Sequence, residues 1–228
     1  MTAGSRRAAL IATLLLVTTT ACSSETGVDG EVVEAATVRV RADGCGPRIE
    51  LGTGTTIADG LVVTAAHVVA GAEHVEVVAR SGTTIDADVV LFDPDLDIAV
   101  LRPFTDAGPP APLRAEPAQE GDVGLVALIA TDRSVELVEV DIVQRVTIRT
   151  TDIYREEPVE RPGLRLDVGV EPGDSGAMVH LPDGGVGIVW SRSTTTNDQA
   201  WTVDLPSDLL DTSTRRALTE PVNVGPCL

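Results

Sequence analysis

The chain has 228 residues, of which 43% are hydrophobic, so it is long enough to bury a core and does not have a disordered composition. Its formal net charge of −18 argues against nucleic acid or an anionic membrane surface as a partner, because both attract clusters of basic residues. Aromatic residues make up only 2%, and the branched aliphatic residues that dominate instead suit many short β-strands.

The N-terminus resembles a secretory signal, because an Arg-Arg pair precedes the apolar run 8–17, which is too short to span a bilayer. Residues 19–22, Thr-Thr-Ala-Cys, are similar to a bacterial lipobox, although the first position usually carries Leu. The pattern predicts that residues 1–21 are removed and that a lipid on Cys22 anchors the protein to the outer face of the cytoplasmic membrane. Ordinary cleavage with a free Cys22 thiol, giving a secreted protein, and an uncleaved anchor are the alternatives.

Only three cysteines are present. If Cys22 is lipidated, an even pair remains, which predicts a disulfide between Cys45 and Cys227. This bond would close a loop around nearly the whole domain and fix the C-terminal tail to the first lobe.

After a predicted polar tether over residues 22–36, the chain alternates short apolar segments with turn signals such as Asp59-Gly60. Residues 65–69 have the length of one helical turn. Strands are predicted in the first lobe at 36–41, 48–57, 61–64, 74–79, 83–91 and 98–101.

Four prolines in the segment 105–121 predict a linker between a first barrel, about 37–104, and a second, about 122–228. The short, closely spaced strands indicate antiparallel barrels or a sandwich rather than βαβ units. A short helix is expected from Ser207, as its N-cap, to Leu218. Strands are predicted in the second lobe at 124–129, 135–150, 164–168, 178–181, 186–191 and 200–203.

The turn from Pro172 to Gly176 presents a hydroxyl, that of Ser175, among small residues. Serine is a weak nucleophile and needs a general base held by an acid; without them, this segment is a glycine-rich surface turn. His67, which follows an apolar strand among small residues, is the best-placed base, and Asp97 immediately precedes another apolar strand. His74 and His180 are expected to be solvated or core histidines.

Three segments resemble the signatures of the chymotrypsin-fold (trypsin-like, S1-type) serine peptidases, in that family's order: Thr64-Ala65-Ala66-His67, Asp97-Ile98-Ala99-Val100-Leu101 and Gly173-Asp174-Ser175-Gly176. The spacing and the export signal are closest to bacterial exported HtrA-like proteases, here without a PDZ domain. The resemblance covers residues 37–220. It implies an all-β fold of two antiparallel six-stranded β-barrels with a short C-terminal helix and the site between the barrels.

The resemblance also implies a serine endopeptidase that acts on protein or peptide substrates and uses no cofactor or metal. His67 would be the general base, Asp97 would orient it, and the backbone N–H groups of Gly173 and Ser175 would form an oxyanion hole. The chain lacks the zymogen activation site whose freed N-terminus neutralises the family's equivalent of Asp174. That carboxylate would then need another cation, and we expect Arg145 or Arg149, or else solvation.

Four residues are predicted to shape the substrate pocket. Gly169 stands six residues before Ser175, where trypsin-like enzymes carry an acid, so a preference for basic side chains is not expected. The strand 187–193 is expected to form the pocket wall and to pair with the substrate backbone, with Trp190 and Ser191 among the residues that bind substrate. Arg192 would either favour acidic residues or narrow the pocket.

Other classes of protein remain open at this point. A protease-fold binding or scaffold protein at the cell envelope would carry the same residues in an inactive geometry, and an esterase would use the same triad. A calcium-binding loop at Asp93, Asp95 and Asp97 is disfavoured, because the glycine and terminal glutamate of such loops are missing.

Overall fold

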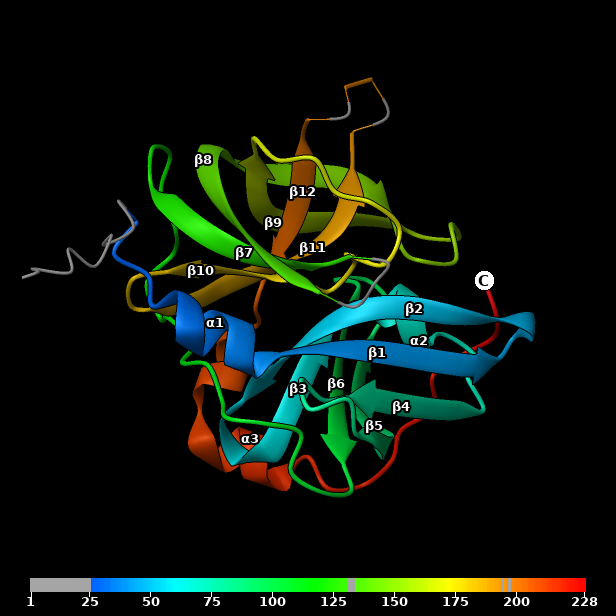
Figure 1. Ribbon diagram of the computed structural model, residues 1–228. Helices are drawn as coiled ribbons and strands as arrows, with labels where there is room; N and C mark the ends of the chain where they lie inside the picture. Colours follow the sequence, from blue (N-terminus) through cyan, green and yellow to red (C-terminus); the bar gives the residue numbers. More distant parts are fainter. Residues whose placement is uncertain (1–25, 131–133, 194, 197) are drawn as a thin grey trace, which may run out of the picture.

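The computed structural model describes residues 26–228 except 131–133, 194 and 197. The predicted N-terminal signal and the lipidation site at Cys22 therefore lie outside the described residues. Two closed six-stranded antiparallel barrels lie one above the other in Figure 1, and this confirms the predicted all-β fold class. No helix among the described residues is long and apolar enough to cross a membrane.

The first barrel has the strand order β1-β2-β3-β6-β5-β4. Valine, isoleucine and leucine side chains from all six strands fill its core, as the branched aliphatic composition predicts. At the Asp59-Gly60 turn both residues have positive φ, 64° and 72°, which is the requirement of a tight hairpin turn. The strands are β1 (Thr37–Gly44), β2 (Gly46–Ile57), β3 (Leu61–Thr64), β4 (His74–Val78), β5 (Thr84–Asp93) and β6 (Ile98–Pro103).

The second barrel has the order β10-β11-β12-β9-β8-β7. Its β9 begins six residues before the predicted strand 164–168, because proline is tolerated where a strand has only one partner. Pro158 and Pro162 pair with β8 alone, whereas β12 joins only at Arg165 and Leu166. The strands are β7 (Val123–Ile129), β8 (Val135–Thr151), β9 (Pro158–Leu166), β10 (Met178–Leu181), β11 (Gly184–Arg192) and β12 (Ala200–Asp204).

The connection between the barrels, residues 105–121, contains no helix or named strand. It is bound to both barrels by main-chain hydrogen bonds, because Ala111 donates to Thr56 and Arg114 donates to Gly185. The connection therefore helps to hold the barrels together.

The predicted polar tether over 22–36 is wrong for its second half, because α1 (Gly30–Ala36) forms there. The Asp29 carboxylate caps this helix by accepting from the backbone N–H groups of Glu31 and Val32. Val33 is buried in a small apolar cluster that includes Leu125 of β7. The helix also contacts β2, so it packs where the two barrels meet (Figure 1).

The predicted helix from Ser207 to Leu218 is in fact two short pieces, a 3-10 turn η2 (Ser207–Leu210) and the helix α3 (Thr212–Ala217). Ser207 does not cap the helix. Asp211 does so instead, since its carboxylate accepts from Thr214 N–H at 2.8 Å.

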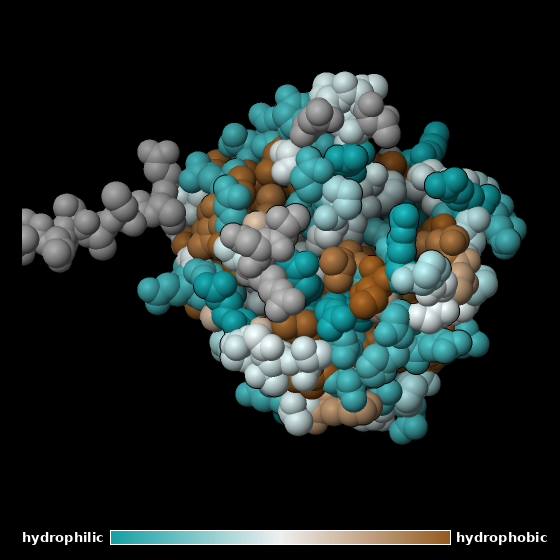
Figure 2. All heavy atoms as spheres, turned by 45° about the vertical axis from the view of Figure 1, so that its right-hand side comes forward, coloured by the Kyte–Doolittle hydropathy of each residue, from teal (hydrophilic) through white to brown (hydrophobic). Residues whose placement is uncertain are grey.

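The C-terminal segment crosses the first barrel, and the predicted disulfide between Cys45 and Cys227 is confirmed. Before it, Gly71 N–H donates to the carbonyl of Val224 at 3.0 Å. In Figure 2, which brings this side of the molecule forward, hydrophobic residues form separate patches among hydrophilic ones rather than one continuous apolar face.

Replacing both Cys45 and Cys227 by serine is expected to lower the free energy of unfolding by about 2–5 kcal/mol, because the bond closes a very long loop in the unfolded chain. Chemical denaturation of the variant and of reduced wild type measures this, and the two should agree. An unchanged unfolding midpoint in both would contradict a stabilising role for the bond.

Candidate active site

His67 and Asp97 are brought together by the pairing of two strands in the first barrel. His67 lies in the one-turn helix α2 (Ala66–Val69), which directly follows β3, and Asp97 directly precedes β6. The β3–β6 ladder pairs Thr64 with Ala99, so the end of one strand faces the start of the other. The backbone N–H of Ala66 then donates to the carbonyl of Asp97 at 3.2 Å.

The Asp97 carboxylate is buried and holds His67 at two points, the imidazole and the backbone N–H. Its Oδ2 lies 2.8 Å from Nδ1 of His67, and its Oδ1 accepts from the backbone N–H of His67 at 2.8 Å. A carboxylate at this distance keeps a proton on Nδ1 and leaves Nε2 free to accept one. Asp97 has φ 61°, a left-handed conformation that aspartate tolerates better than most residues.

The Ser175 turn belongs to the second barrel but is bonded to the first. Thr53 of β2 donates its N–H to the carbonyl of Ser175 and its hydroxyl to that of Gly173, both at 2.8 Å. Gly176 has φ 90°, and a Cβ there would lie 2.1 Å from the carbonyl of Thr53 and 2.6 Å from Oγ1 of Thr64. The turn thus packs against the strand that leads into His67.

Two backbone N–H groups in this turn, those of Gly173 and Ser175, donate to no acceptor in the described part of the chain. The N–H between them, on Asp174, donates to the carbonyl of Glu171 at 3.0 Å. Gly173 has φ 108°, and nothing lies within 4 Å of the position that a Cβ would occupy. Both predicted oxyanion-hole donors are therefore available to a ligand.

The Ser175 hydroxyl does not hydrogen-bond to His67 within the described residues. Catalytic hydrogen bonds are often long without substrate and shorten when it binds. The structure thus joins His67 to Asp97 directly and brings Ser175 near them through the backbone.

Our prediction that Arg145 or Arg149 neutralises Asp174 is wrong. Arg145 pairs with Asp204 and Arg149 with Glu160, since both project from β8 toward nearer acids. The buried Asp174 carboxylate instead accepts from the backbone N–H groups of Glu171, at 2.8 Å, and Ile129.

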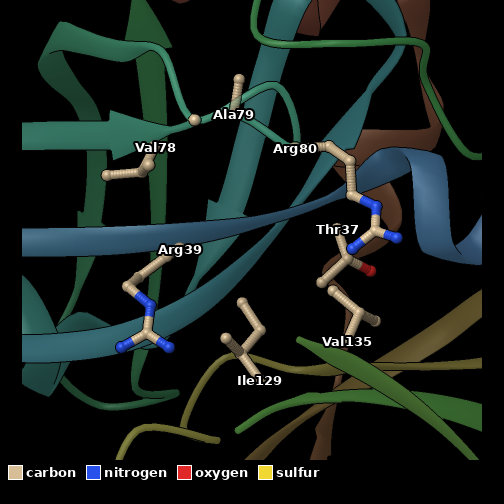
Figure 3. A pocket seen from close by; sticks show the side chains of 8 residues that line it. Thr37, Arg39, Val78, Ala79, Arg80, Ile129 and Val135 are labelled. Carbon is tan, nitrogen blue, oxygen red and sulfur yellow. The ribbon is translucent and has the colours of Figure 1, made fainter. Parts of the chain in front are cut away.

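Burial raises the pKa of Asp174, although these hydrogen bonds and the charge of Arg39 oppose the shift. Figure 3 shows Arg39 and Ile129 around one small cavity at the junction of the barrels. Asp174 is thus held by main-chain amides and lies in the field of a more distant arginine.

Replacing Asp174 by asparagine is expected to raise the melting temperature at about pH 7, because the amide keeps an acceptor for Glu171 and removes a buried charge. A carboxyl with a raised folded pKa stabilises the protein below its unfolded pKa, about 3.9, and loses that contribution as pH rises through the folded pKa. The gain should therefore shrink toward about pH 3.5.

Calorimetry across this pH range tests the prediction, with the exposed Asp183→Asn as control. A difference between Asp174→Asn and wild type that does not change with pH would contradict it.

A cavity beside Ser175 contains three of the four predicted pocket residues, Trp190, Ser191 and Arg192. Gly169 is exposed and lies outside its lining. Arg192 pairs at 3.2 Å with Glu171, so its charge is already partly balanced. Two further lining residues, Pro172 and Val189, belong to the predicted turn and to the predicted segment 187–193, whereas the sequence did not indicate Val170 and Glu171.

The other histidines lie away from this site. His180 is buried in the second barrel, where burial lowers its pKa to about 4, so it is a neutral core residue. His74 is exposed, and its Nε2 lies 3.4 Å from Oδ1 of Asp86.

In the described part of the chain, the ligand atoms close enough to share a metal ion belong to His74, Glu76 and Asp86. Asp97 is engaged with His67, which leaves the aspartate run 93–97 poorly suited to calcium.

One residue at the site was not predicted at all. Arg161 of β9 is 2% exposed, and its guanidinium lies 4.6 Å from the ring centroid of Trp190. Together with His67 and Asp97 it lines a second cavity. No motif marks it, because only the approach of the two barrels buries it.

The sequence matches a known family of peptidases and several known serine proteases. Residues 52–187, which include His67, Asp97 and Ser175, match the model of the trypsin-like peptidase domain. The chain is 30% identical over 199 residues to the serine protease Rv3671c of Mycobacterium tuberculosis, covering 86% of this chain and 49% of that protein. It is 29% identical to the Do-like serine protease HtrA of Lactococcus lactis, covering 64% of this chain and 37% of that one. The chain thus spans about half the length of the first of these relatives and less than half the length of the second.

Solved structures give the same result. The active form of the Rv3671c protease superposes with a TM-score of 0.77 at 28% identity, covering 95% of this chain and 99% of that one. The inactive form of the same protease superposes with a TM-score of 0.68 at 28% identity, covering 81% of this chain and 92% of that one. A serine endoprotease from Yersinia pestis, 23% identical, shares the fold with a TM-score of 0.62, covering 82% and 64%. The protein belongs to the family of trypsin-like peptidases.

Proposed function

We propose that this protein is an exported serine endopeptidase that hydrolyses peptide bonds through Ser175, His67 and Asp97. The observation that carries the proposal is the hydrogen bond between the His67 imidazole and the Asp97 carboxylate, with 2.8 Å between Nδ1 and Oδ2. It leaves Nε2 as the basic nitrogen of the imidazole, and the Ser175 turn is bonded to the strand beside it.

In this mechanism His67 removes the proton of Ser175 as the hydroxyl oxygen attacks the substrate carbonyl. Asp97 stabilises the imidazolium that forms, and the free N–H groups of Gly173 and Ser175 bind the developing oxyanion. His67 then protonates the leaving amine, which gives the acyl-enzyme. In the second half of the reaction His67 removes a proton from water, the water oxygen attacks the acyl carbonyl, and His67 returns the proton to Ser175 as the acid product leaves.

The substrate would lie along β11, in the cavity beside Ser175. The wall of this cavity is made by Val189 and Trp190, and the ion pair of Arg192 with Glu171 stands at its exposed end. Because the lining contains no unpaired acid within the described residues, basic side chains are not expected to be preferred.

A catalytically inactive binding or scaffold protein is the alternative, and an esterase would use the same groups. The greater similarity to the active form of the Rv3671c protease, with a TM-score of 0.77 against 0.68 for the inactive form, favours the enzyme. Incubation with a mixed peptide library and mass spectrometry of the products tests the proposal. Cleavage at defined internal bonds is expected, and hydrolysis of small esters alone would contradict an endopeptidase.

Export is supported by the Arg-Arg pair and apolar run of the signal, by the disulfide, which persists in oxidising compartments, and by a relative from Halomonas elongata named as a probable periplasmic endoprotease. We further propose that residues 1–21 are removed and that Cys22 is lipidated. Incorporation of labelled fatty acid into the wild type and not into Cys22→Ala is expected, and equal labelling of both would refute lipidation at that cysteine.

A further inference from the structure

We infer that Arg161 is a positioning residue that holds the Asp97 carboxylate and the Trp190 ring in their working places, an inference that rests on the proposed function. Arg161 lies on β9 in the second barrel, whereas Asp97 belongs to the first. Its side chain is 2% exposed, and that of Asp97 is 3% exposed. Arg161 therefore spans the junction between the two barrels at the site itself.

All three nitrogens of the Arg161 guanidinium face the turn that ends at Asp97. Nε donates to the carbonyl of Asp95 at 2.6 Å, and Nη2 donates to that of Pro94 at 3.3 Å. Nη1 lies 3.9 Å from Oδ2 of Asp97, the oxygen that also faces His67. The hydrogen bonds fix the backbone of the turn, and the charge acts on the carboxylate.

The turn needs such support because Asp97 has a positive φ of 61°. The carboxylate of Asp93 supports it from inside, by accepting from the N–H groups of Asp95 and Leu96. Arg161 supports it from the opposite barrel, together with the N–H of Ile153, which donates to Pro94 at 3.2 Å. A rigid turn matters here, since a small displacement of a catalytic group costs a large factor in rate.

The guanidinium also lies over the Trp190 ring, with Cζ 4.6 Å from the ring centroid. Trp190 lines both the cavity beside Ser175 and the cavity beside His67. One arginine thus contacts both the turn that carries the orienting acid and the wall of the substrate site. Lysine has no planar fork and cannot reproduce both contacts.

Packing alone does not explain an arginine at this position. Burial lowers the pKa of Arg161, which is the sign of a desolvation cost, and nearby carboxylates oppose that shift. An apolar side chain would fill the space without this cost. The charge is balanced by four aspartates, which are Asp93, Asp95, Asp97 and Asp152.

The test compares Arg161→Gln and Arg161→Lys with wild type on a peptide that the wild type cleaves. We expect Arg161→Gln to lower kcat by about tenfold to a hundredfold, with a smaller change in KM, and Arg161→Lys to recover part of the loss. Arg149→Gln, which removes an arginine that is largely exposed on the neighbouring strand, is the control and should leave kcat unchanged.

The pH profile of kcat/KM separates positioning from a general loss of structure. Loss of the cation beside the His67–Asp97 pair favours the protonated imidazole, so the acid limb should move to higher pH in Arg161→Gln but much less in Arg161→Lys. The charged groups that stay around the pair, Asp152 and Arg155 in the same cavity, are common to all variants.

If Arg161→Gln does not fold, the kcat and pH profile of Arg161→Lys test the inference instead. All rates are divided by the concentration of folded protein. Unchanged kcat and an unmoved acid limb in every folded variant would overturn the inference. A wild type that cleaves no peptide would instead be a failure of the proposed function.

Discussion

Replacing Ser175 by alanine is expected to lower kcat for peptide cleavage by about 10⁶-fold, because the nucleophile is lost and only the remaining binding groups assist water. The turn should keep its shape, since its bonds to the first barrel come from main-chain atoms, such as the carbonyl of Ser175 that accepts from Thr53. KM should change little, because alanine removes a single oxygen atom and leaves the other residues that line the cavity unchanged.

Steady-state kinetics on one peptide measures this effect. Ser81→Ala, a change in an exposed turn of the first barrel, is the matched control and should behave as wild type. Retention of more than a small fraction of the activity by Ser175→Ala would show that another group attacks the substrate.

Replacing Asp97 by asparagine is expected to lower kcat by about 10⁴-fold with little change in structure. The asparagine oxygen can still accept the backbone N–H of His67, which lies 2.8 Å from Oδ1 in the wild type. The amide nitrogen would donate to Nδ1, so the ring proton would move to Nε2, where His67 can no longer act as a base.

The measurement is kcat/KM as a function of pH, with the exposed Asp86→Asn as control. Because hydroxide can partly replace the base, activity of Asp97→Asn should rise at high pH. Near-normal activity at neutral pH would contradict the role given to Asp97.

Most strands of the fold could be predicted because their signals are local. The run Leu61–Thr64 forms β3 as predicted, and the Asp59-Gly60 turn before it has the two positive φ angles that its residues favour. By contrast, α1 was missed because its stability depends on Val33 packing against Leu125, a contact between residues far apart in the chain. Only Val33 and Ala36 of this helix are buried, which is too few to give a helical repeat in the sequence.

The candidate site likewise has residues that the sequence predicts and contacts that it does not. His67, Asp97 and Ser175 follow from short motifs, since those residue types are needed for the chemistry. The groups that hold Asp174 are main-chain amides, which any residue supplies, so no sequence pattern identifies Glu171 or Ile129 as its partners.

The central claim, that Ser175 is the activated nucleophile, is tested most directly by labelling the folded protein with a fluorophosphonate and locating the adduct by mass spectrometry. We predict one adduct, on Ser175, that is absent from Ser175→Ala and strongly reduced in His67→Ala, because only a serine beside a general base reacts rapidly. No labelling of folded wild type, or a label on another residue, would contradict the account.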